Sequence, residues 1–279
     1  MGLRINANVA SMNTLNTLSS TKGKLDMAMS RLSSGSKINK PSEDAAGMAI
    51  SEGLKARVRG LKQSDRNAQD GISLIQVAEG GLNEVSNILI RLRELGIQSA
   101  SDTISDRERK LINIEYKQML DEVDRIAATT EFNGTNLLSG KADTIDFQIN
   151  TKNSPLADRI SFDGRASNVK TQVLGLDGAT VADKFSAQQS LGMVDSAIQY
   201  VAGLRSGFGS IQSRLNSTVE NLQQSSENTA TANSRIRDAD VAEESTNLAK
   251  QNILMQAGTS ILAQSNQQGQ LALQLMKQG

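Results

Sequence analysis

Apolar residues in this chain recur every seven positions, in steps of four and three, over five separate stretches. Two turns of an α-helix take about seven residues, so each stretch carries one narrow apolar seam. The sequence therefore predicts a mainly α fold of long antiparallel helices in a coiled-coil-like bundle. The seam residues are Leu15, Leu18, Leu25, Met29 and Leu32; Leu54, Leu61, Ala68, Ile75, Leu82 and Leu89; Ile112, Tyr116, Met119, Val123 and Ile126; Val194, Val201, Phe208, Leu215 and Leu222; and Val241, Leu248, Met255 and Leu262.

The first and last stretches are predicted to pair as helices. The N-terminal segment is mainly basic, with Arg31 and Lys37 among its charges, and the C-terminal segment opens on acidic residues that include Asp240 and Glu244. Opposite charges favour an antiparallel return of one helix along the other. Two helices bury little surface, so we expect both ends to fold fully only against other copies.

Residues 131–185 follow a different pattern. Residues 144–149 alternate apolar with polar side chains, as a half-buried strand does, and residues 159–163 offer a second strand. The intervening turn residues 152–155 make an antiparallel β-hairpin the expected result. The long helices run toward this small β region and return from it.

Local signals predict where the helices begin and end. Pro41 interrupts the first helix, because proline lacks a backbone N–H donor, and residues 42–44 cap the second. Ser105 followed by Glu108 forms a capping box, which predicts a helix start there. Ser186 with Gln189 is a weaker candidate for the same arrangement.

Two missing residue types limit the chemistry of the chain. Among 279 residues there is no histidine and no cysteine. A Ser-His-Asp triad, a Cys-His pair, a structural zinc site and a disulfide are therefore all excluded. Carboxylate or lysine catalysis stays open, although a chain with 3% aromatic residues lacks the usual lining of a pocket. We expect no enzymatic activity and no cofactor or metal.

The charge balance and the hydropathy pattern argue against two classes of partner. Thirty basic residues match thirty acidic ones, whereas nucleic-acid binders carry a basic excess. No stretch approaches the ~20 apolar residues of a membrane-spanning helix. The first eight residues also lack the apolar core of a secretory signal. We expect neither nucleic acid nor membrane as a partner.

Several clusters allow a structural and a functional interpretation. The acidic groups at 43–44, 121–124 and 238–244 are interpreted as helix starts and solvated faces, not metal sites. Three glycines at 203, 207 and 209 follow no strand, which argues against a phosphate-binding loop. Residues 91–95 are either a solvated helix face or a patch for an anionic partner.

Five motifs together resemble the two ends of bacterial flagellin. Three lie in the N-terminal half: RLSSGSKIN (31–39), DAAGMAI (44–50) and NAQDGIS (67–73). Two lie near the C-terminus: SRIRDAD (234–240) and QAGTSILAQ (256–264). The similarity covers about residues 1–140 and 190–277.

The resemblance implies a structural subunit that polymerises with itself into the extracellular filament of the bacterial flagellum, used for swimming. It also implies a terminal domain of residues 1–43 with 238–279, which lines the filament core, and a second domain of residues 44–237. The large outer domains of many family members have only residues 131–185 as a counterpart. Export unfolded through the flagellar type III apparatus fits a chain without disulfides.

The resemblance also implies partners beyond the chain itself. These are a flagellar export chaperone, the cap protein and hook-associated proteins. The family's contact region for Toll-like receptor 5 of a host has counterparts at Arg91, Leu95 and Glu115, although Met119 and Ile90 depart from that motif. The same face is expected to be buried between subunits.

Three alternatives remain for function. A hook–filament junction protein shares end helices with flagellin, but residues 67–73 and 257–264 favour flagellin. A zinc peptidase inserted between the halves would need histidines that the chain lacks. A basic amphipathic helix at residues 15–40 that binds a membrane surface is the third.

Overall fold

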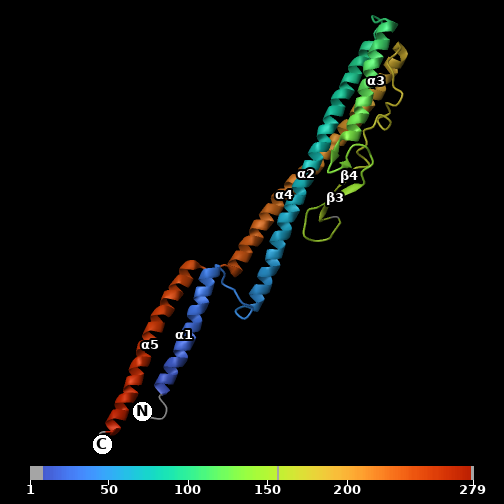
Figure 1. Ribbon diagram of the computed structural model, residues 1–279. Helices are drawn as coiled ribbons and strands as arrows, with labels where there is room; N and C mark the ends of the chain where they lie inside the picture. The colour runs from blue at the N-terminus through green and yellow to red at the C-terminus, as the bar shows by residue number, and fades with distance from the viewer. Residues whose placement is uncertain (1–8, 156, 278–279) are drawn as a thin grey trace. The chain divides into compact units, whose positions relative to one another are not determined.

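Each heptad stretch forms a helix in the computed structural model, which describes residues 9–155 and 157–277, with side chains described up to residue 267 (Figure 1). The prediction of a mainly helical fold with a small β region is confirmed. The helices are α1 (Val9–Ser34), α2 (Ala45–Ala100), α3 (Asp106–Thr129), α4 (Lys184–Arg237) and α5 (Val241–Lys277). The strands are β1 (Glu131–Phe132), β2 (Thr135–Asn136), β3 (Thr144–Gln148) and β4 (Arg159–Asp163).

The first helix ends earlier than predicted. It stops at Ser34 because Gly35 has a φ of +67°, a left-handed conformation that ends a helix at little cost only for glycine. Pro41 therefore lies in the connecting segment and does not interrupt the helix. The second helix is capped as expected, since the Asp44 carboxylate accepts the backbone N–H of Gly47 at 2.8 Å.

Of the two later helix starts that were predicted, the start of α3 is correct and the start of α4 is not. The Glu108 carboxylate accepts the backbone N–H of Ser105 at 2.8 Å, which confirms the capping box that opens α3. The prediction at Ser186 is wrong. Helix α4 begins at Lys184, three residues earlier than a cap at Ser186 would place it, because Asp183 acts as its cap and accepts the backbone N–H of Ser186 at 3.0 Å.

The same caps predict an acid-dependent loss of stability. Backbone N–H donors lower the pKa of Glu108 and of Asp183 below the ordinary values of 4.5 and 3.8, and an ion pair with Lys184 lowers that of Asp102. A carboxyl whose pKa is lower in the folded state contributes stability above its unfolded pKa and loses it as the pH falls through the folded pKa. The thermal midpoint should therefore fall as the pH drops below about 4.5. Glu108→Gln should flatten this dependence, measured by circular dichroism, and an unchanged slope would contradict the assignment.

The chain divides into two compact units. Unit 1 comprises residues 1–56 and 228–279, and unit 2 comprises residues 57–227. Helices α2 and α4 contribute residues to both units.

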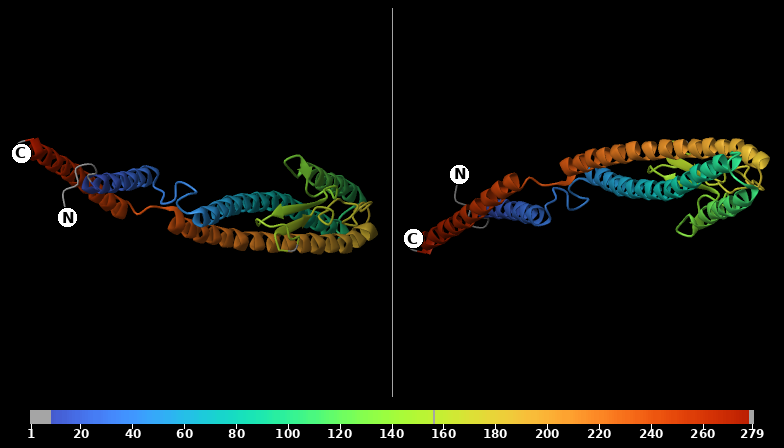
Figure 2. Two further views of the ribbon diagram at one scale, coloured as in Figure 1. Left: turned by 90° about the horizontal axis from the view of Figure 1, so that it is seen from below. Right: turned by 90° about the horizontal axis from the view of Figure 1, so that it is seen from above.

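Unit 2 is built on a long antiparallel helix pair. Both views in Figure 2 show the unit-2 parts of α2 and α4 side by side, with α3 along the other side of α2. Ion pairs on the surface span these contacts: Arg93 with Asp195 at 2.6 Å, Arg205 with Glu79 at 3.8 Å, and Arg91 with Glu115 at 2.9 Å. Their exposure means that the helices are held mainly by the seams beneath.

The predicted hairpin is confirmed, and a second, smaller hairpin precedes it. Strands β3 and β4 pair antiparallel from Thr144 opposite Asp163 to Gln148 opposite Arg159. The β1–β2 hairpin turns through Asn133 and Gly134, whose φ angles of 49° and 75° are typical of a two-residue hairpin turn. Asparagine followed by glycine is the residue pair that such a turn favours, because both tolerate a positive φ.

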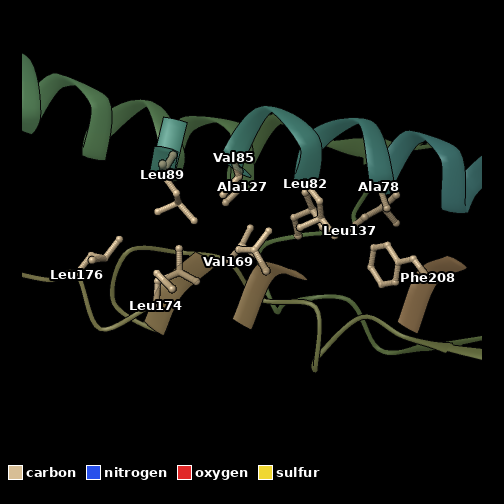
Figure 3. Close-up of a cluster of buried hydrophobic side chains, with 14 of the residues drawn as sticks. Ala78, Leu82, Val85, Leu89, Ala127, Leu137, Val169, Leu174, Leu176 and Phe208 are labelled. Carbon is tan, nitrogen blue, oxygen red and sulfur yellow. The ribbon is translucent and has the colours of Figure 1, made fainter. Parts of the chain in front are cut away.

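The hairpin and the loop after it complete the core of unit 2. Phe162 of β4 stacks obliquely on Phe208 of α4, with ring centroids 5.3 Å apart. Figure 3 shows Leu82 and Val85 of α2 facing Leu137 and Val169 from the non-helical segments. All four of these side chains are completely buried. The α2 seam is therefore covered by residues from the region between the helices as well as by α4.

Two adjacent glycines in α2 should respond oppositely to alanine. A Cβ at Gly81 would lie 2.7 Å from Thr130 Oγ1 and 2.8 Å from Leu138 Cδ1, whereas a Cβ at Gly80 meets nothing within 4 Å. Gly81→Ala should lower the free energy of unfolding by about 1–2 kcal/mol through overpacking. Gly80→Ala should raise it by about 0.5–1 kcal/mol, because alanine has less conformational entropy to lose. Urea unfolding of both variants checks this, and equal effects would contradict the packing.

Candidate assembly surface

Helices α1 and α5 of unit 1 pack against each other along their lengths. The pairing is antiparallel, because Arg31 near the end of α1 contacts Glu244 near the start of α5, while Ser11 donates a hydrogen bond to Asn266 at 3.2 Å. Between these ends, Leu18 lies over Gly258. The predicted pairing of the terminal helices is confirmed.

The less exposed positions of both helices recur in steps of three and four, and they define the α1–α5 seam. Several seam positions hold small or polar residues, which let two helices approach closely. The seam of α1 contains Ser11, Thr14, Leu18, Thr21, Leu25, Ala28 and Leu32. The seam of α5 contains Glu244, Leu248, Gln251, Met255, Gly258, Leu262 and Ser265.

Six of the nine predicted seam residues lie in this seam: Leu18, Leu25, Leu32, Leu248, Met255 and Leu262. The other three do not, and their side chains are exposed: Leu15 by 49%, Met29 by 56% and Val241 by 62%. Counting only apolar residues assigned Leu15 and Met29 to the seam, although the true seam neighbours are Thr14 and Ala28. Their exposure within one chain leaves these three side chains available to other molecules.

An apolar surface remains uncovered on both helices outside the seam. Its members are 40–65% exposed, and we call them the outer apolar faces. Exposed apolar surface of this extent marks a site of association in a soluble protein. On α1 the members are Val9, Met12, Leu15, Met27 and Met29, and on α5 they are Val241, Ile253, Leu254 and Ile261.

Main-chain hydrogen bonds join the segment after α1 to the segment before α5, and the sequence did not predict them. Ser36 and Asp238 form an isolated antiparallel bridge. Lys37 donates its backbone N–H to the Arg237 carbonyl at 2.6 Å, and Ala239 donates to the Gly35 carbonyl at 2.9 Å. Two segments about 200 positions apart in sequence are thereby joined, and no local pattern encodes such a contact.

The patch at residues 91–95 combines an ion pair with buried leucines. Arg91 bonds Glu115 at 2.9 Å and Glu94 at 3.0 Å on the surface, where these side chains are about half exposed. Leu95 is only 1% exposed, so its side chain is not available to a receptor or to another subunit. Of the three predicted contact residues, only Arg91 and Glu115 meet at the surface.

The described side chains offer no metal centre. Within residues 9–155 and 157–267, no group of three acidic side chains is placed to hold a metal ion. None of the helices described has an apolar stretch long enough to cross a membrane. The acidic group at 238–244 instead caps and pairs: Asp240 accepts the backbone N–H of Ala242, and Glu244 bonds Arg31.

Both halves of the chain match models of one protein family. Residues 5–143 match the bacterial flagellin N-terminal helical region, and residues 191–276 match the bacterial flagellin C-terminal helical region. The flagellin of Halalkalibacterium halodurans is 41% identical over 98% of this chain and 99% of its own length. The flagellar filament core protein flaB2 of Brachyspira hyodysenteriae is 38% identical over 98% and 99%.

Solved structures agree with the fold. The crystal structure of Bacillus cereus flagellin is 31% identical and has a TM-score of 0.50, covering 56% of this chain and 88% of that one. A hook-associated protein from Vibrio parahaemolyticus has a TM-score of 0.59 over 70% of this chain at 15% identity, which shows a shared fold alone. The family models, the full-length relatives and the paired terminal helices agree: the chain belongs to the bacterial flagellin family and is a structural subunit of the extracellular flagellar filament, not an enzyme.

Proposed function

We propose that the outer apolar faces of α1 and α5 form the contacts between subunits in the filament, and that this filament drives swimming. The observation that carries the proposal is the combination of a satisfied inner seam with an uncovered apolar surface on the same two helices. Seam residues, among them Leu18 and Leu262, bind the helices to each other, whereas outward residues such as Met12 and Ile253 have no partner within the described chain.

Burial of the outer apolar faces stabilises association enough only when each subunit contacts several neighbours at once. Full burial of one such side chain contributes about 1.5–3 kcal/mol, and these side chains are already partly covered. Fixing one subunit in place costs about 4–15 kcal/mol. A helical lattice, in which one subunit meets several neighbours at once, supplies the required sum. A single pairwise contact on one face does not.

We further propose export of the unfolded chain through the flagellar type III apparatus, with a flagellar chaperone, the cap protein and hook-associated proteins as partners. The chain has no cysteine, so no disulfide opposes unfolding before export. The proposed terminal domain remains residues 1–43 with 238–279, and the second domain residues 44–237. Toll-like receptor 5 stays a proposed host partner through Arg91 and Glu115, without Leu95.

Seeded elongation tests the assembly function. Purified monomer mixed with filament fragments under mildly salting-out conditions should lengthen the fragments, measured by electron microscopy. Monomer that never adds to the seeds would contradict the proposal. Deleting the gene should remove filaments and stop swimming, and loss of extracellular protein in a type III export mutant would support the route.

A further inference from the structure

We propose that Met12, Met27 and Met29 form an oxidation site on the outer apolar face of α1, and that their conversion to sulfoxides keeps a free chain out of the filament. Their side chains are 60%, 40% and 56% exposed. Oxidants convert the methionine thioether to a sulfoxide, and access to the sulfur is required for this reaction. The inference rests on the proposed assembly function, because the outer apolar faces are the surfaces proposed to contact other subunits.

The other methionines whose side chains the structure describes are less accessible. Met119 and Met193 are half-buried against the core of unit 2. Met255 lies in the α1–α5 seam, and Met48 in the first turn of α2 is partly covered. Among the side chains described up to residue 267, exposed methionine is therefore confined to the helix that is proposed to contact other subunits.

The three exposed methionines lie on both sides of the α1 seam. Met12 and Met29 each follow a seam residue by one position, as Leu15 does, so these three side chains share one flank of the helix. Met27 precedes a seam residue by one position and lies on the other flank. A neighbouring subunit that covers either flank therefore buries a thioether, which is apolar and adapts to irregular contacts.

Hydrogen peroxide is the oxidant to which the proposal refers. An electron pair of the methionine sulfur attacks one peroxide oxygen, the O–O bond breaks, and the second oxygen leaves as water with both protons. The sulfur is oxidised by two electrons and the peroxide is reduced by two. The product is a polar sulfoxide at a position that was apolar, and methionine sulfoxide reductases reverse the change.

The consequence differs between the free chain and the filament. In the free chain, water solvates a sulfoxide at these exposed positions, so the packing of α1 on α5 is unaffected. In the filament, the sulfoxide oxygen would be buried against apolar side chains without a hydrogen-bond donor, which is unfavourable. Burial of the thioethers in the filament also excludes the oxidant. Oxidation should therefore block the addition of free chains and spare subunits that are already assembled.

Peptide mapping by mass spectrometry tests the reactivity. Full-length monomer is treated with dilute hydrogen peroxide, and the sulfoxide at each methionine is followed with time. Met12 and Met29 should react at least about fivefold faster than Met119 and Met193, because access to the sulfur sets the order. In assembled filaments, Met12 and Met29 should react at least about fivefold more slowly than in the monomer.

Seeded elongation tests the effect on assembly. Peroxide-treated monomer, freed of peroxide, should extend filament fragments at least about tenfold more slowly than untreated monomer, because each buried sulfoxide opposes association. Treatment with methionine sulfoxide reductases A and B, which act on the two sulfoxide epimers, should restore the rate to within about twofold.

Leucine variants identify the methionines responsible. The triple variant Met12→Leu, Met27→Leu and Met29→Leu keeps apolar side chains of similar volume, so it should elongate normally before and after peroxide treatment. The matched control carries Met119→Leu and Met193→Leu in unit 2. This control should lose elongation after peroxide treatment as strongly as the unmodified chain.

Equal inhibition of the triple variant and the unmodified chain by peroxide would overturn the inference. Protection by Met255→Leu alone would also overturn it, because the sensitive sulfur would then lie in the seam. If the triple variant does not elongate before oxidation, the three single leucine variants replace it. Weaker inhibition of any of them than of the unmodified chain supports the inference, and equal inhibition of all three overturns it.

The proposed function and this inference fail in different ways. Untreated monomer that never elongates seeds would contradict the assembly function. Normal elongation by monomer that carries sulfoxides at positions 12, 27 and 29 would overturn only the oxidation site. Equal reactivity of these methionines in monomer and filament would show that the outer apolar face of α1 stays uncovered, which contradicts both.

Discussion

Replacing Ile253 with lysine is expected to slow seeded elongation about 100-fold or more. Ile253 is 65% exposed and lies midway between the seam residues Gln251 and Met255, on the opposite side of α5. In the proposed filament this side chain is covered by another subunit. An ammonium buried there without a partner costs about 3 kcal/mol or more, and each 1.4 kcal/mol corresponds to a factor of ten.

The conservative variant Ile253→Leu is the matched control, and it should elongate seeds at nearly the unmodified rate. Both variants should have the same thermal midpoint for the monomer, because residue 253 makes no contribution to the core of unit 2. Elongation rates come from filament lengths in electron micrographs at fixed monomer concentration. Normal elongation by Ile253→Lys would show that this face of α5 stays in contact with water in the filament.

Replacing Arg109 with alanine is expected to lower the free energy of unfolding of unit 2 by about 3 kcal/mol. Arg109 is only 7% exposed. Its Nε donates to the Ser99 carbonyl at 2.9 Å and one Nη donates to the Ser101 carbonyl at 2.8 Å. These carbonyls belong to the C-terminal end of α2 and the turn after it, where no further helical N–H is available. The exposed carboxylate of Asp106, also bonded to Arg109, adds little.

The neighbouring arginine provides a control of identical chemistry. Arg107 is exposed, so Arg107→Ala should change the free energy of unfolding by less than about 0.5 kcal/mol. Arg109→Lys should fall between the two, because an ammonium keeps the charge but cannot bond both carbonyls with a planar fork. Urea unfolding of the monomer followed by circular dichroism measures all three. Equal effects at positions 107 and 109 would contradict the structural role of Arg109.

Helix content was predictable because it depends on a repeat within one segment. The fourth stretch illustrates this, since Val194, Val201, Phe208, Leu215 and Leu222 were predicted from spacing alone and all are at most 5% exposed. The β3–β4 hairpin and the Ser105 cap were predictable for the same reason, as each is encoded within a few adjacent residues.

The seam between α1 and α5 was predicted only in part. Spacing predicted Leu18 and Leu25 correctly but favoured Leu15 and Met29 over Thr14 and Ala28, because a large apolar side chain is the usual occupant of a buried helix position. In a tight helix pair, a small side chain at the contact is as well suited as a large one. Which neighbour faces the partner depends on the partner, and the partner lies more than 200 residues away.

The sequence by itself determined the helices, the hairpin and the excluded chemistry, because these follow from local periodicity and from residues that are absent. The tertiary structure alone decided which sides of α1 and α5 are covered, that Arg109 holds the end of α2, and that Ser36 meets Asp238. These features depend on contacts between distant segments. Their energies are set by distances and burial that no local repeat specifies.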